Sequence, residues 1–213
     1  MRRLLGLVIA GIAAGTVAVP GASAAGLPDA GCTVQPGLTI VQNNGDLKIA
    51  QTFTAIHTGR LDTVQMTVRN PTGATPGDWR FEIAAATGGT PGAVLASTTV
   101  PNTLAANVLG SITGTFSSPA AVTAGGSYAV LLSRPGSSKY EVADAAGDPC
   151  PGQQAFYQNL VSGPFISYNF VDFGFATTVQ PPTGATSAKK CKKKHKKHAA
   201  AAKKHKKCKK KRK

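Results

Sequence analysis

The chain is poor in the side chains that most hydrolases use for catalysis. It contains two glutamates, Glu82 and Glu141, and His57 is its single histidine before the last 25 residues. It has no Gly-x-Ser-x-Gly elbow, the turn that exposes the nucleophile of an α/β-hydrolase. A Ser-His-Asp site needs a histidine beside its nucleophile, whereas His57 lies next to the turn residue Gly59, which is typical of a surface loop. We therefore expect no enzymatic activity.

A glycan-active enzyme is an alternative, because glycoside hydrolysis needs only two facing carboxylates. Glu82 shares a strand face with Arg80, so we expect it to face solvent and to pair with a base. The sequence also leaves open a catalytic pair formed by two aspartates. The candidates are Asp62, Asp78, Asp144, Asp148 and Asp172.

Helical periodicity is absent between Ala25 and Val179. Short β-like runs alternate there with turn residues. In one run Val64, Met66 and Val68 alternate with polar side chains, which is typical of a sheet with one wet face. About nine or ten strands at this spacing predict an all-β fold, an antiparallel β-sandwich over residues 25–179.

The predicted strands are separated by recognisable turn signals. Asn43–Asp46 is a strong hairpin signal between two β-like runs, Leu38–Gln42 and Leu47–Ala55. Pro119–Gly126 is predicted to be a turn region and Asp144–Gly152 a loop. The remaining predicted strands are Arg60–Arg69, the run around Phe81, Ala93–Val100, Ser111–Ser117, Ser127–Ser133, Tyr140–Val142, Ala155–Gln158, Ile166–Tyr168 and Val171–Val179.

The N-terminus has the pattern of an export signal. Arg2 and Arg3 precede the apolar stretch Leu4–Ala14, and Ala22-Ser23-Ala24 has the small-residue pattern of a cleavage site. We predict a signal peptide over residues 1–24 and a secreted protein, extracellular or associated with the cell wall. A retained N-terminal membrane anchor is the alternative.

Cysteine is scarce, and its positions fall into two pairs. Cys32 and Cys150 belong to the predicted sandwich, and an even count in an exported protein predicts a disulfide between them, with two free thiols as the alternative. Cys191 and Cys208 lie near the C-terminus. A continuous helix would separate them by roughly 25 Å, whereas a disulfide needs Cα atoms within about 7 Å. A bridge there and a continuous helix exclude each other, and bridging between chains is a further option.

Acidic residues are absent from Lys189–Lys213, the segment that we call the basic tail. Residues 25–188 hold six basic and nine acidic residues, a net charge of −3, whereas the tail carries +16. Such a segment lacks the apolar mass for a core, so we predict that it is disordered or partly helical after a linker at 180–188. Its sixteen cations are Lys189, Lys190, Lys192, Lys193, Lys194, Lys196, Lys197, Lys203, Lys204, Lys206, Lys207, Lys209, Lys210, Lys211, Arg212 and Lys213.

The composition of the tail predicts binding to polyanions such as anionic wall polymer or lipid, through screened charges. Metal capture is an alternative, but the spacing of the candidate ligands matches no zinc pattern and the neighbouring ammonium groups repel cations. These ligands are His195, His198, His205, Cys191 and Cys208. A merely solubilising tail is the other alternative.

Several motifs resemble one known type of module. They are Gln51–Ala55, Gly59-Arg60-Leu61, Gly77-Asp78-Trp79, Thr90-Pro91-Gly92, Ala124–Val130 and Asp172–Phe175, in this order. This series resembles a bacterial extracellular jelly-roll-type β-sandwich found in surface and secreted proteins, often as a companion domain without a known ligand. The resemblance implies a jelly-roll-like topology. The tail resembles the basic, low-complexity ends of exported proteins in some high-GC Gram-positive bacteria.

Two further groups are candidates for ligand binding. The rings of Phe156, Tyr157, Phe165, Tyr168 and Phe170 cluster in one segment, and we expect them to cap the core. The alternative is a sugar-binding surface formed by Phe156, Tyr157, Phe165 and Tyr168. Asp144 and Asp148 share a predicted loop and Asp46 lies in another, without Asp-x-Asp-x-Asp spacing, so a structural calcium ion is an option and solvated acids are the default. We expect neither a cofactor nor a metal.

These features together predict a secreted, non-catalytic envelope or matrix module that its tail holds on anionic surface polymer. A carbohydrate-binding module and a glycan-active enzyme are the alternatives. The expected partners are a polyanion, a glycan, and the wall or a membrane surface at its periphery. No element that reads bases is visible, so no specific nucleic acid is expected.

Overall fold

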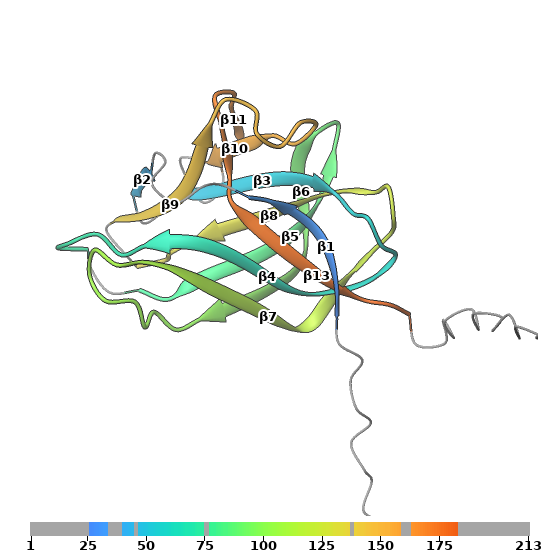
Figure 1. The fold of residues 1–213 in the computed structure, drawn as a ribbon, viewed down its shortest axis with the longest axis horizontal. Coiled ribbons are helices and arrows are strands. Elements are labelled where there is room, and N and C mark those ends of the chain that lie inside the picture. Colours follow the sequence, from blue (N-terminus) through green and yellow to red (C-terminus); the bar gives the residue numbers. More distant parts are fainter. Residues whose placement is uncertain are drawn as a thin grey trace, which may run out of the picture. The chain divides into compact units, whose positions relative to one another are not determined.

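The computed structural model describes residues 26–33, 40–44, 47–74, 77–136, 139–158 and 163–182. These residues belong to one compact unit, which ends at Thr183. Within the described ranges the chain forms thirteen strands and no helix, and the strands build two antiparallel sheets that pack as a sandwich (Figure 1). The prediction of an all-β, antiparallel sandwich is confirmed, and the jelly-roll-like topology stays a prediction.

Seven strands form the larger sheet. Its main order is β1 (Leu27–Cys32), β13 (Phe175–Gln180), β4 (Gly59–Arg69), β9 (Lys139–Ala146) and β12 (Val171–Phe173), with β7 (Leu109–Val122) paired to β4 and β2 (Ile40–Asn44) paired to β9. One edge of β4 is paired with β7 over its whole length. The other edge is shared end to end, since β13 pairs with Arg60–Met66 and β9 with Val68 and Arg69. This change of partner leaves a junction in the sheet next to Gly174.

Six strands form the smaller sheet. Their order is β11 (Ile166–Tyr168), β10 (Ala155–Gln158), β3 (Lys48–Thr54), β8 (Ser127–Ser133), β5 (Trp79–Thr87) and β6 (Thr90–Val100). The central strand β8 pairs with β3 on one side and with β5 on the other.

Period-two alternation produces the core between the sheets. In β4 the side chains of Val64, Met66 and Val68 are buried while Gln65 is exposed, as the sequence predicts. In β5, Trp79 and its alternate neighbours are fully buried. Burial of such side chains stabilises by roughly 25 cal/mol per Å² of apolar surface, so these central strands hold the sandwich together.

A second apolar layer covers the outer face of the smaller sheet. Ala50, Leu131 and Phe156 are neighbours across three strands, and their residue parity places them opposite the main core. In the same row Glu82 forms ion pairs with Lys48 and with the exposed Arg80. The prediction that Glu82 pairs with a base is confirmed. The prediction that it faces solvent is wrong, since Glu82 is only 3% exposed between its two cations.

Three connections differ from the sequence-based expectations. The hairpin around Asn43–Asp46 does not form, because β2 pairs with β9 in the larger sheet while β3 belongs to the smaller sheet. The strand predicted at Val171–Val179 is two strands, and Gly174 separates them. β7 continues through Pro119, where the register with β4 shifts, so the missing proline N–H falls at a bulge rather than in a regular ladder.

Candidate functional site

A disulfide lies where the two sheets meet the loop after β9. Cys32 ends β1, and Cys150 belongs to the loop between β9 and β10. The two residues are joined, with Cα atoms 5.7 Å apart and 118 positions between them in sequence. The predicted Cys32–Cys150 bridge is confirmed, and it ties the first described strand to a late loop.

Next to this disulfide, Gln51 joins the smaller sheet to the larger one. Its side-chain Nε2 donates a hydrogen bond to Oδ1 of Asp172 at 2.7 Å, and its Oε1 accepts one from the backbone N–H of Phe173 at 2.8 Å. The backbone N–H of Cys150 donates to Oδ2 of Asp172 at 3.1 Å. Asp172 thus receives one bond from a neighbouring sheet and one from the loop.

The carboxyl group of Asp172 lacks a counter-charge. It is 2% exposed, and no Lys, Arg or His of the described residues forms an ion pair with it. Burial raises the pKa of Asp172, the charge of Asp148 adds to this effect, and the hydrogen bonds from Gln51 and Cys150 oppose it. A carboxylate in such a setting favours a proton or a cation.

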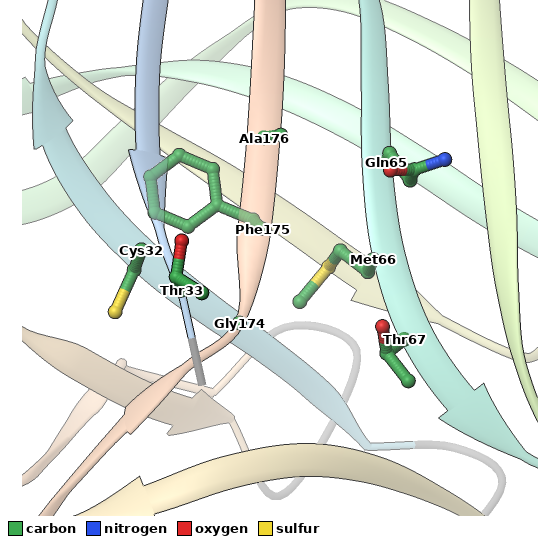
Figure 2. A pocket seen from close by; sticks show the side chains of 8 residues that line it. All are labelled: Cys32, Thr33, Gln65, Met66, Thr67, Gly174, Phe175 and Ala176. Atoms are coloured by element: carbon green, nitrogen blue, oxygen red, sulfur yellow. The ribbon is translucent and has the colours of Figure 1, made fainter. Parts of the chain in front are cut away.

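A small pocket opens beside the same junction. Its volume is about 170 Å³. Figure 2 shows the side chains that line it, which lie at the end of β1, on β4 and at the start of β13. They are Cys32, Thr33, Gln65, Met66, Thr67, Phe175 and Ala176, and Gly174 lines the pocket with its backbone. The space accommodates a few water molecules or a small ion rather than a sugar chain.

A wider groove lies between the sheets on another side of the sandwich. It holds about 430 Å³ and is lined by Val94–Ser97 of β6 and by Ser117 and Ser118 of β7. Its lining has hydroxyl groups and the exposed aliphatic side chains of Val94 and Leu95, with no charged residue.

The four predicted sugar-binding rings form two separate pairs. Phe156 is 6% exposed and contacts Phe165 edge to face in the apolar layer outside the smaller sheet. Tyr157 and Tyr168 form another edge-to-face pair, with centroids 5.8 Å apart, and both are half-buried. Packing therefore occupies much of the first pair, and in the second pair Tyr168 also packs against the main core.

The most exposed ring in this region is Phe170. It is 77% exposed in the turn between β11 and β12, and Ile166 of β11 is 40% exposed. The backbone carbonyl of Phe170 accepts a hydrogen bond from Gly147 N–H, which holds the turn against the loop after β9. We call Tyr157, Ile166, Tyr168 and Phe170 the aromatic lobe.

The two glutamates lie on opposite faces of the sandwich. Glu82 is on the outer face of the smaller sheet, while Glu141 is on the outer face of the larger sheet, between the core residues Tyr140 and Val142. Packed sheets are about 10 Å apart, so the core separates these carboxylates. They do not face one another as a glycosidase pair does, and Glu141 is paired with Arg69.

Asp144 is not in a loop, contrary to expectation. β9 continues to Ala146, and Asp144 is fully buried on the strand face that carries Tyr140 and Val142. Neither carboxyl oxygen has a hydrogen-bond partner among the described residues, and burial raises the pKa of Asp144 to about 6. Asp148 is exposed in the following loop, so the two acids do not form the loop cluster that calcium would need. Asp46 lies outside the described residues.

The histidine of the sandwich occupies the bend after β3, as predicted. The backbone N–H groups of Ile56 and His57 donate to Oδ1 of Asp29 at 2.9 and 2.7 Å. Asp29 therefore caps the bend and positions the chain rather than the imidazole.

The predicted signal peptide, the basic tail with Cys191 and Cys208, and the tail histidines lie outside the described residues. In the part of the chain that the structure describes, no helix has the length and apolar character needed to span a bilayer.

No protein-family model and no curated protein sequence matches this chain. Among solved structures, it is similar to the cysteine protease and lectin-like domains of Cwp84, a surface layer associated protein of Clostridium difficile. The identity is 13%, the TM-score is 0.45, and the similarity covers 70% of this chain and 37% of that one. This chain thus spans little more than a third of that structure.

Proposed function

We propose that the protein is a non-catalytic module that works outside the cytoplasm and that its basic tail holds it on anionic polymer. The observation that carries this proposal is the division of charge, −3 over residues 25–188 and +16 over Lys189–Lys213. Closely spaced ammonium groups release counterions from a polyanion, which favours binding that weakens as salt rises.

The sandwich supports this division because it has little cationic surface of its own. Of the six basic residues between Ala25 and Ala188, Lys48 and Arg80 pair with Glu82, and Arg69 pairs with Glu141. Arg134 is fully buried over the ring of Trp79. Attraction to a polyanion therefore belongs to the tail.

The position of the chain exit also supports the proposal. β13 runs from Phe175, beside the disulfide junction, to Gln180, and Val179 pairs with Leu27 at the start of β1. Six residues of strand span about 20 Å. The tail is therefore attached at the end of β13 that is remote from β12.

The test is retention on purified anionic cell wall. The full chain and a chain ending at Ala188 are compared at low and high salt. We expect the full chain to be retained at low salt and released at high salt, and the shorter chain to remain in solution. Equal retention of both chains at low salt would refute the role of the tail.

Carbohydrate binding by the sandwich is a second candidate, which the 77% exposure of Phe170 beside the half-buried Tyr157–Tyr168 pair favours. Exposed rings stack on the apolar faces of sugars. The chain ending at Ala188 would be applied to a glycan array, since tail-driven binding is then absent. A Phe170→Ala exchange should abolish any signal, and a signal that persists would place the sugar elsewhere.

A further inference from the structure

The disulfide and Asp172 bring three metal-binding atoms together, two sulfurs and one carboxylate oxygen. The Sγ atoms of Cys32 and Cys150 and a carboxylate oxygen of Asp172 lie within 4.8 Å of one another. In the oxidised protein the sulfurs are bonded to each other, and cysteine binds metals as the thiolate. We propose that reduction of this disulfide creates a binding site for a thiophilic divalent cation such as Zn²⁺, held by both thiolates and by Asp172.

The geometry needs only small adjustments. Tetrahedral zinc binds sulfur at about 2.3 Å and carboxylate oxygen at about 2.0–2.2 Å, which places the sulfurs about 3.8 Å apart and each about 3.6 Å from the oxygen. The Cα atoms of the cysteines, 5.7 Å apart, permit this sulfur separation by side-chain rotation. The carboxylate oxygen of Asp172 lies at most 4.8 Å from the cysteine sulfurs, so it has to move by about 1 Å to reach the separation that zinc requires.

The charge of Asp172 is the second observation that points to a cation. The carboxyl group is buried, and no described basic side chain pairs with it. Its two hydrogen bonds, from Gln51 and from the backbone of Cys150, orient the group and still leave lone pairs on both oxygens. Donors of this kind around a metal ligand hold it in place.

The pocket supplies access. Cys32 is one of the residues that line the 170 Å³ space in Figure 2, together with Thr33, Gln65 and Thr67. This space borders Cys32 and is not lined by Cys150 or Asp172; a water molecule can occupy the fourth coordination position. Cys150 is also partly exposed, so a small reductant reaches the bond.

The chemistry balances with a dithiol as the reductant. Its two sulfurs are oxidised to a cyclic disulfide while the Cys32–Cys150 bond is broken and both cysteines take up a proton. Metal binding then releases both thiol protons to solvent, so the affinity for the ion increases with pH.

The test uses the full chain with Cys191→Ser and Cys208→Ser, so that the tail contributes no thiol. Co²⁺ is titrated into the reduced and the oxidised protein, and the thiolate-to-metal charge-transfer absorbance is recorded. We expect one ion per reduced chain and no such absorbance for the oxidised chain. Asp172→Asn should weaken binding by about tenfold or more, while Asp78→Asn, an exposed control, should leave it unchanged.

A matched chain with Cys32→Ser and Cys150→Ser keeps the tail histidines and measures their contribution. If reduction destabilises the protein, Zn²⁺ must raise the melting temperature of the reduced protein. The absence of any rise would overturn the proposal. Equal Co²⁺ binding by the reduced chain with and without Asp172→Asn would also overturn it. Neither outcome depends on the proposed function, because the cations of the tail take no part in the site.

Discussion

Gln51 joins the two sheets through one amide group. Its nitrogen and oxygen are both used, by Asp172 and by the backbone of Phe173. Because Gln51 is fully buried, water cannot replace either partner if the amide is removed. The side chain of Gln51 therefore contributes to stability by satisfying the hydrogen-bonding groups of Asp172 and Phe173.

Gln51→Ala should lower the free energy of unfolding by about 2–4 kcal/mol, because it leaves the Phe173 N–H and a carboxylate oxygen without a partner. Urea denaturation measures the change. Gln65→Ala is the matched control, since Gln65 is exposed on β4 and its loss should change stability by no more than about 0.5 kcal/mol. An equally small effect for Gln51→Ala would show that the bridge does not stabilise the fold.

Asp144 makes the stability depend on pH. Its pKa in the folded protein is about 6, whereas the ordinary value, which the unfolded chain retains, is 3.8. Between these values the folded form keeps its proton while the unfolded form has lost it. Stability therefore declines as pH rises from about 4 to about 6 and levels off above that range.

Asp144→Asn removes this ionisation and should stabilise the protein at pH 7.5 by about 1–3 kcal/mol, with little gain at pH 4. Thermal unfolding at the two pH values measures the difference. The control is Asp78→Asn, which changes an exposed carboxylate. A variant that is less stable than the parent at pH 7.5 would contradict this account.

At the scale of elements, the alternation of apolar and polar residues predicted which face of a strand is buried. It did not predict which strand pairs with it. β4 and β5 were predictable because each has apolar side chains on one face, which is the direct consequence of burial on one side. The turn signal at Asn43–Asp46 predicts a change of direction, and it carries no information on whether the next strand stays in the same sheet. β2 crosses to β9, nearly a hundred residues away in sequence.

At the candidate site, too, local sequence patterns did not predict contacts between distant residues. An even cysteine count predicted the Cys32–Cys150 pair, since only two cysteines belong to the sandwich. The bridging role of Gln51 was not predictable, because its partner Asp172 is 121 positions away. The burial of Asp144 was missed because a polar residue after Tyr140–Val142 resembles the start of a loop. The sequence placed Phe170 in the aromatic cluster, but it did not show that this ring is the most exposed of them, because exposure depends on tertiary packing.

The contact between the sheets near β7 depends on a residue without a side chain. A Cβ atom at Gly114 would lie 2.7 Å from Cδ2 of Phe81 and 3.0 Å from Cγ2 of Thr98. Phe81 is fully buried, so it cannot move away without disturbing the core. Gly114 thus allows β7 to approach β5 and β6.

Gly114→Ala should destabilise the protein by about 1–3 kcal/mol through this overpacking. The matched control is Thr115→Ala on the same strand, because Thr115 is exposed. The midpoint of chemical denaturation distinguishes the two. Equal midpoints would show that the strands separate enough to admit a methyl group at no cost.

At the scale of the whole molecule, the proposed function divides between two parts of the chain. The sandwich has a continuous core, a cross-link between distant segments, and most of its own cations paired or buried. The basic tail adds sixteen positive charges. Binding to polyanions should therefore depend on the number of tail cations and should not depend on the integrity of the aromatic lobe.

The most direct measurement is the affinity of the full chain for a defined polyglycerol phosphate as the salt concentration is raised. A chain in which the tail lysines are exchanged for glutamine serves as the control of equal length. We predict that the logarithm of the affinity of the full chain falls steeply and linearly with the logarithm of salt, and that the control binds weakly at every concentration. Tight binding by the control, or an affinity that salt does not change, would contradict the account.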